Sequence, residues 1–306
     1  MNGLVAAERS PSRPGPGAVP ETVLRALELT LATRIEGVLT GDYASRRLGR
    51  GTELAQIRPY EPETDDVRLI DWKVTARTGV PHVRVQLAER VLVTWLLLDA
   101  SASMDFGTAA RRKADVAEGV ALTLGYAATR RGNRVGAVVF GEGGTTVRPP
   151  RHGYEGMMGL FTAFAPAERR SGTGSLADSL ARVSKVARQR ALIVLVSDFR
   201  GPRDWRRPLL DIAGRHELLA VEIADPRERE LPDVGEVRLI DPETGRQVTV
   251  ETSNPVFRER FAAAAAEERR EVAMLLASAG ARHVVLDTEK DWLRMFVAFL
   301  RGGPPQ

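Results

Sequence analysis

The segment Val91-Leu-Val-Thr-Trp-Leu-Leu-Leu-Asp99-Ala-Ser101-Ala-Ser103-Met104 begins as an apolar run and continues into side chains that carry oxygen atoms. A run of β-branched, aromatic and leucine residues is typical of a strand buried on both faces, as in a parallel sheet. Sites in open α/β sheets form beyond the carboxyl ends of the strands, where Asp99, Ser101 and Ser103 would lie. Oxygen ligands suit a hard divalent cation such as Mg²⁺. We therefore expect a buried strand that ends in candidate metal ligands.

The pattern Asp-x-Ser-x-Ser after a buried strand resembles the metal-ion-dependent adhesion site of von Willebrand factor A domains. This resemblance implies that Asp99, Ser101 and Ser103 hold Mg²⁺, or alternatively Mn²⁺ or Ca²⁺, and that one coordination position is open to a partner's carboxylate. The alternative interpretation is a serine-rich turn that caps a helix.

A second acidic residue follows the apolar run Ala191-Leu-Ile-Val-Leu-Val196, in the pair Ser197-Asp198. Asp198 matches the aspartate that completes the adhesion site, often through a water molecule. The glycine that usually follows is Phe199 here, and we expect this side chain to narrow the space beside the metal. The resemblance also implies a threonine ligand from the loop before the next helix. Thr173 is the first choice and Ser175 the second, although either hydroxyl could instead cap that helix.

The rest of the chain alternates between apolar strand patterns and helical periodicity. This alternation predicts a doubly wound, mostly parallel α/β sheet over residues 90–300, with right-handed crossovers. Residues 1–20 are rich in proline and glycine, so we expect a flexible tail there. Residues 21–89 are expected to form a helix and a small β module, and residues 301–306 a frayed tail.

The module contains a long motif that resembles the domain-of-unknown-function family 58, carried by Gly49, Gly51, Glu53, Arg58, Tyr60, Asp65, Asp66, Arg68, Asp71, Trp72, Ala76 and Arg77. That family couples such a segment to a von Willebrand factor A-like domain, and its genes often neighbour those of MoxR-type AAA+ ATPases. The first interpretation of the motif is a salt-bridge and hydrogen-bond network that fixes the turn and anchors Trp72 in an apolar pocket. The second is a docking surface for a partner, formed by Asp65, Asp66, Arg68, Asp71, Trp72 and Arg77.

The composition narrows the function classes. The chain has 306 residues, is 43% hydrophobic and contains no cysteine, which excludes disulfides and cysteine-held metals. It shows no apolar run of bilayer length and no signal peptide, so we expect a cytoplasmic protein without a membrane span. The net charge is +4, but arginines and acidic residues are interleaved, so nucleic acid is not the expected partner.

The sequence favours a non-enzymatic, metal-dependent protein-binding or scaffolding protein. The resemblance implies work with a MoxR-type AAA+ ATPase, or with its client protein, in the chaperone-like assembly of a client complex. A metal-dependent hydrolase and a basic nucleic-acid-binding protein are the alternatives. No P-loop, H-E-x-x-H or G-x-S-x-G pattern is present, so no catalytic residues are assigned.

Overall fold

The computed structural model describes residues 15–17, 48–63, 65–87, 93–130, 132–153, 155–156, 159–160, 174–240 and 246–302. The chain divides into two compact units, residues 1–34 with 92–306 and residues 35–91. The helix expected after Pro20 lies outside the described residues. In the predicted N-terminal tail, the carbonyl of Pro16 accepts a hydrogen bond from Trp292 Nε1 at 3.1 Å.

The larger unit is built on one six-stranded sheet with the order β10-β7-β6-β3-β4-β5. The strands are β3 (Val93–Ala100), β4 (Arg134–Gly141), β5 (Thr146–His152), β6 (Leu192–Ser197), β7 (Glu217–Ala224) and β10 (Arg282–Asp287). Five strands run parallel, and β5 pairs antiparallel with β4 at one edge. The prediction of a doubly wound, mostly parallel α/β sheet is confirmed.

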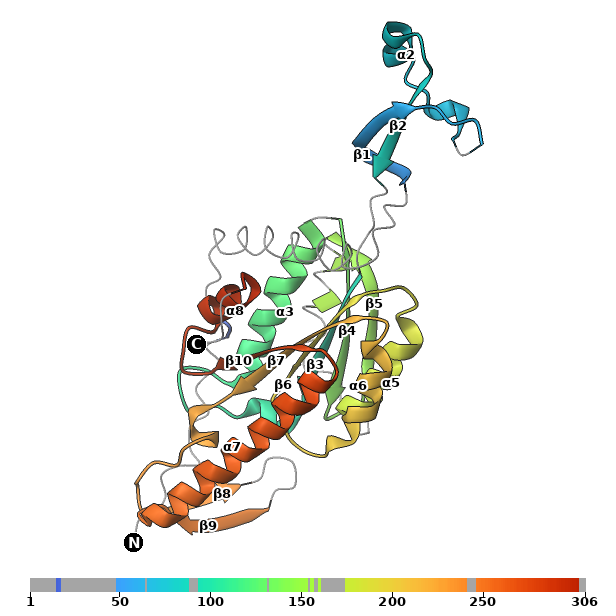
Figure 1. Cartoon of the computed structure of the whole chain (residues 1–306). Coiled ribbons are helices and arrows are strands. Elements are labelled where there is room, and N and C mark those ends of the chain that lie inside the picture. Colours follow the sequence, from blue (N-terminus) through green and yellow to red (C-terminus); the bar gives the residue numbers. More distant parts are fainter. Residues whose placement is uncertain are drawn as a thin grey trace. The chain divides into compact units, whose positions relative to one another are not determined.

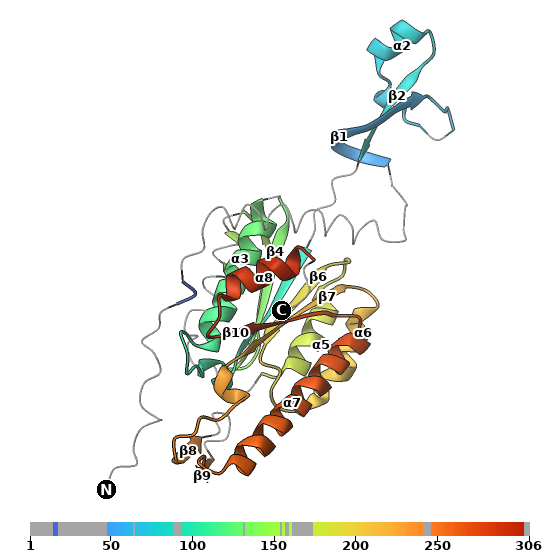
Figure 2. The same cartoon turned by 60° about the vertical axis from the view of Figure 1, so that its left-hand side comes forward.

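Helices cover both faces of this sheet (Figures 1 and 2). One face carries α3 (Lys113–Arg130) and α8 (Trp292–Leu300). The other carries α5 (Leu176–Val186), α6 (Arg206–Ala213) and α7 (Pro255–Ser278). A buried apolar cluster joins these last three helices to the central strands, with Leu97, Leu195 and Leu276 nearly inaccessible to solvent. The layers therefore fix the central strands, and with them the residues at their ends.

The strand order reverses between β3 and β6. The chain leaves β3 through α3 toward β4 on one side, whereas β6, β7 and β10 follow on the other side. Such a topological switch point is where open α/β sheets bind ligands, outside the carboxyl ends of the strands. Asp99 and Asp198 lie at the carboxyl ends of β3 and β6, so the sheet places both carboxylates at the switch point.

Short elements complete the larger unit. The strands β8 (Glu236–Ile240) and β9 (Gln247–Glu251) form a separate antiparallel pair. The described residues of this unit also include the 3₁₀ helices η2 (Ala102–Asp105), η3 (Arg203–Trp205) and η4 (Pro226–Glu228), which follow strand ends or precede helices. Within the described part of the chain, no helix has the length and apolar character needed to span a bilayer.

The smaller unit pairs β1 (Leu48–Pro59) with the antiparallel β2 (His82–Leu87), and the link between them contains η1 (Val67–Leu69) and α2 (Trp72–Thr78). The helix α2 begins after Asp71, whose carboxylate accepts hydrogen bonds from the amides of Lys73 and Val74. It ends at Gly79, which has a left-handed backbone with φ of 75°. Within the smaller unit, the expectation that Trp72 is anchored in an apolar pocket is wrong, because the indole is 69% exposed. As the first residue of a short helix, Trp72 points outward from its own unit.

Candidate binding site at the carboxyl edge of the sheet

Asp99 is held at the end of β3 by the hydroxyls of two serines. Its Oδ1 accepts hydrogen bonds from Ser101 N at 2.9 Å and from Ser101 Oγ at 2.6 Å, and its Oδ2 accepts one from Ser197 Oγ at 2.5 Å. Burial and the nearby negative charge of Asp198 raise the pKa of Asp99 to about 6, although the serine hydrogen bonds act in the opposite direction. Both carboxylate oxygens are thus engaged by the chain itself.

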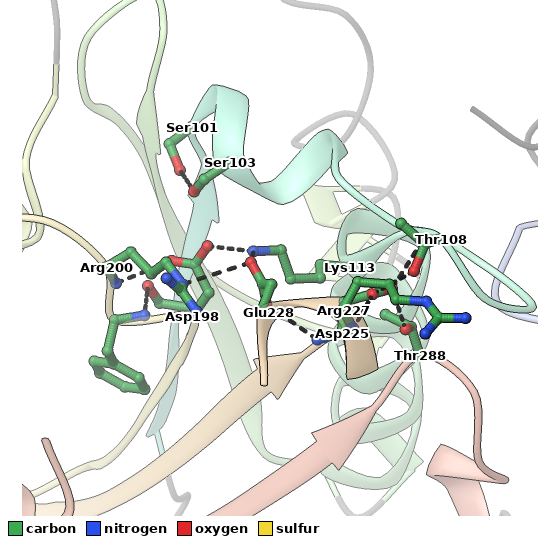
Figure 3. Close-up of polar contacts among 12 residues, drawn as sticks. Ser101, Ser103, Thr108, Lys113, Asp198, Arg200, Asp225, Arg227, Glu228 and Thr288 are labelled. Carbon is green, nitrogen blue, oxygen red and sulfur yellow. Dashed lines mark hydrogen bonds and ion pairs between the residues drawn. The ribbon is translucent and has the colours of Figure 1, made fainter. Parts of the chain in front are cut away.

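Ser101 and Ser103 lie at the start of the short helix η2, as Figure 3 shows. Their Oγ atoms are 3.1 Å apart. Ser103 is buried and hydrogen-bonds to the Asp198 side chain, which links the loop after β3 to the loop after β6. The structure therefore brings together four of the predicted ligands, Asp99, Ser101, Ser103 and Asp198.

Asp198 faces an ammonium group. Its Oδ2 accepts a hydrogen bond from Lys113 Nζ at 2.6 Å, and its Oδ1 accepts one from the amide of Arg200 at 3.1 Å (Figure 3). Burial alone would raise the pKa of Asp198, but the Lys113 ammonium and these hydrogen bonds hold it below the usual value. Asp198 is therefore an ionised carboxylate in a buried ion pair.

Lys113 is the first residue of α3 and is fully buried. Its Nζ also donates to Glu228 Oε1 at 2.7 Å. Burial alone would lower the pKa of Lys113, but Asp198 and Glu228 raise it above the usual value, so this lysine carries its charge. Sequence analysis did not assign Lys113 or Glu228 to the site. The available signal was a lysine, one of only four, at the start of a helix that directly follows the Asp-x-Ser-x-Ser loop.

A third buried carboxylate, Asp225, ties the surrounding loops together after β7. Its oxygens accept hydrogen bonds from Thr108 N at 2.8 Å, Thr108 Oγ1 at 2.5 Å and Thr288 Oγ1 at 2.7 Å. The amide of Asp225 in turn donates to Glu228 Oε2 at 3.0 Å. Glu228 therefore joins the Asp225 cluster to the Lys113 ammonium, and the loop before α3 is fixed on both sides (Figure 3).

Phe199 does not narrow the site, contrary to expectation. Its phenyl ring is 2% exposed and packs into the apolar core, with its centroid 5.8 Å from that of Trp205. Its backbone has φ of 53°, in the left-handed region where glycine is usual. The backbone thus keeps the conformation that a glycine would adopt, and the side chain serves the core.

The loop ligand expected before α5 is not part of this cluster as far as the described residues show. Thr173 lies outside them. Ser175 is the N-cap of α5: its Oγ accepts a hydrogen bond from Asp178 N and donates one to Asp178 Oδ2, both at 3.0 Å. Ser175 thus performs the capping role that was the alternative, and Thr173 stays a prediction.

The arrangement does not fit the divalent cation that the adhesion-site pattern implies. The pattern uses the Asp198 carboxylate as a metal ligand, but this carboxylate is hydrogen-bonded by the ammonium of Lys113. The positive charge at this edge of the sheet comes from the chain itself.

The motif residues of the smaller unit serve mainly local structure. Asp65 forms a bidentate ion pair with Arg58, with N–O distances of 2.7 and 2.8 Å. Asp66 accepts a hydrogen bond from the amide of Arg68 and caps η1. The side chains of Arg68 and Arg77 are exposed. A docking role for this surface stays a prediction.

The strand order reverses between β3 and β6, and a carboxylate lies at the carboxyl end of each strand. These features define a doubly wound α/β domain with a candidate ligand-binding site at its topological switch point. The chain belongs to the family described as "Protein of unknown function DUF58", which matches residues 56–271. The resemblance inferred from the motif is thereby confirmed.

Known proteins similar to this chain include one close in sequence and two solved structures. "Uncharacterized protein Rv1480" of Mycobacterium tuberculosis is 42% identical over 281 residues, which cover 90% of this chain and 87% of that protein. The conserved hypothetical protein BatB from Bacteroides thetaiotaomicron aligns with a TM-score of 0.45 and 14% identity, over 67% of this chain and 95% of that chain. A von Willebrand factor type A structure from Catenulispora acidiphila aligns with a TM-score of 0.34 and 14% identity, over 73% of this chain and 43% of that chain. The fold class rests on the strand order itself.

Proposed function

We propose that the protein acts by binding another protein at the carboxyl edge of its six-stranded sheet, and not by catalysing a reaction. The observation that carries this proposal is the convergence of Asp99 and Asp198 at the switch point, each with both oxygens hydrogen-bonded by the chain itself. A general base needs a carboxylate oxygen that can reach a substrate proton. Carboxylates engaged in this way instead hold the surrounding loops in one shape.

The rim of this edge offers groups that suit a protein partner. Phe106 is 37% exposed, and the side chain of Arg200 is 40% exposed. Aromatic and arginine side chains are enriched among the residues that dominate binding energy at protein interfaces. The buried Nζ of Lys113 lies 5.8 Å from the centroid of the Phe106 ring, so a cation–π contact holds this ring in place.

The partner class follows from the family resemblance. We propose a MoxR-type AAA+ ATPase, or its client protein, with chaperone-like assembly of a client complex in the cytoplasm as the setting. A metal-dependent form of this proposal, in which Mg²⁺ or Mn²⁺ bridges Asp99 and the two serines to a partner's carboxylate, requires Lys113 to leave Asp198.

The test is surface-plasmon resonance between the full-length protein and a MoxR-type AAA+ ATPase from the same organism. We expect Phe106→Ala and Arg200→Ala to weaken binding by about tenfold or more each, the effect of a typical hot-spot residue. Met274→Ala is the control, because Met274 is an exposed apolar residue near the carboxyl end of α7, which leads into β10. Equal binding by wild type and both rim variants would refute this binding face.

A further inference from the structure

We infer that Lys113 supplies, from within the chain, the positive charge that the adhesion-site pattern assigns to a divalent cation, so the site is complete without metal. The inference rests on the proposed function only for the identity of the partner that the site binds. Its geometry concerns three side chains from different parts of the chain: Lys113 at the start of α3, Asp198 after β6 and Glu228 in η4.

The ammonium of Lys113 lies between two carboxylates, as a bound metal cation would. Its Nζ lies 2.6 Å from Asp198 Oδ2 and 2.7 Å from Glu228 Oε1, and Asp198 is also bonded to Ser103. These are ordinary lengths for charge-assisted hydrogen bonds. They exceed the metal–oxygen distances of about 2.0–2.1 Å for Mg²⁺, and they lie at or beyond the upper limit of about 2.3–2.6 Å for Ca²⁺. The two carboxylates thus hold the ammonium by hydrogen bonds of ordinary length.

The position of Lys113 is costly for a lysine, which argues for a specific role. The side chain is completely buried, and an ammonium removed from water is strongly unfavourable unless it is paired. It also lies at the first residue of α3, where the helix dipole disfavours positive charge. Two carboxylates within hydrogen-bond distance compensate for both effects. Loss of the ammonium would leave Asp198 without its counter-charge and Glu228 with the guanidinium of Arg200, whose Nε lies 3.5 Å from Glu228 Oε1.

The cation and the ammonium exclude each other. A divalent ion close to Asp198 would lie against a like charge in a buried setting, where repulsion is screened less than in water. Removal of the ammonium makes a bound cation favourable, because Asp198 and Glu228 then lie close together with the oxygens of Ser103 and Ser101 nearby. The wild-type protein should therefore ignore divalent ions, whereas a variant without the ammonium should gain a site for one.

The experiment compares full-length wild type with Lys113→Met, which keeps an unbranched side chain but removes the charge. Lys290→Met, a substitution of an exposed lysine, is the matched control. Mn²⁺ binding is followed by electron paramagnetic resonance, and melting temperatures are compared in EDTA, Mg²⁺ and Ca²⁺. We expect wild type and Lys290→Met to bind no Mn²⁺ and to melt at the same temperature in all three solutions. Lys113→Met should bind one equivalent, and its melting temperature should rise by about 5–10 °C with the preferred ion at about one hundred times its dissociation constant.

Two results would overturn the inference. One is a wild-type protein that binds one equivalent of Mn²⁺ or melts lower in EDTA, and this measurement stands even if Lys113→Met does not fold. The other is a folded Lys113→Met protein that binds no divalent ion, because Lys113 would then not occupy a cation position. Neither result depends on a partner. If the ATPase fails to bind the rim while the metal measurements come out as expected, the proposed function fails and the inference about Lys113 holds.

Discussion

Asp99→Asn should change how the stability of the protein depends on pH. Burial and the charge of Asp198 raise the pKa of Asp99 from 3.8 to about 6. A pKa that is higher in the folded than in the unfolded state stabilises the protein below pH 3.8, and this stabilisation is lost as the pH rises through about 6. Because one pKa unit corresponds to about 1.4 kcal/mol, the loss at neutral pH is about 3 kcal/mol. Asparagine keeps the shape of the side chain but does not ionise, so the variant should escape this loss.

The assay is urea unfolding of wild type and Asp99→Asn at a series of pH values from 4 to 7.5. The free energy of unfolding of the variant, minus that of wild type, should increase by about 2.5 kcal/mol across this range, because part of the loss has already occurred at pH 4. His216, whose pKa is lowered by burial, is common to both proteins, so its contribution cancels in the difference. Asp204→Asn, at an exposed position, is the control and should change stability by less than about 0.5 kcal/mol. A difference that does not vary with pH would refute the reasoning, because Asp99 would then be ionised throughout, as it would be beside a bound cation.

Other substitutions test the smaller unit, the left-handed backbone at Phe199 and the buried carboxylate of Asp225. Trp72→Ala should change the free energy of unfolding by less than about 0.5 kcal/mol, measured by thermal melting, because the indole is exposed. Phe199→Ala should destabilise the protein by about 3–5 kcal/mol in urea unfolding, and Phe199→Gly by about 1–2 kcal/mol less, because glycine relieves the left-handed backbone; equal losses would contradict the role of the backbone. Asp225→Ala should cost about 3 kcal/mol or more and make the loop around Thr108 sensitive to limited proteolysis, because several buried hydrogen bonds lose their acceptor.

The sheet could be predicted from the sequence because its central strands are continuous apolar runs. The strand β5 was not predicted, because it contains Pro149, Pro150 and two arginines and shows no apolar strand pattern. Proline is tolerated at a sheet edge, where its missing amide leaves no ladder partner unsatisfied, and β5 is such an edge. The helix α2 was missed because seven residues show no helical periodicity, although Asp71 and Gly79 carry the signals of its two ends.

The site was predicted in part, and the missing part has a physical reason. Asp99 and Asp198 could be placed together because each follows a buried strand, and neighbouring parallel strands end at the same edge. Lys113 and Glu228 are separated by 115 positions along the chain, and only the packing of α3 and η4 against the strand ends brings them together. From the sequence, Lys113 was part of a helix and Glu228 one charge in an interleaved surface segment.

A completely buried ammonium does not touch a partner, so Lys113 must act through the groups that it holds. Asp198 accepts hydrogen bonds from Lys113 and from the amide of Arg200, and it is bonded to Ser103 as well. One carboxylate therefore fixes the start of α3, the loop after β6 and the helix η2 relative to one another. Rigid placement of these segments lowers the entropy that binding would otherwise cost, which strengthens association without adding a contact. In this arrangement the internal ion pair sets the shape of the rim to which we propose that a partner binds.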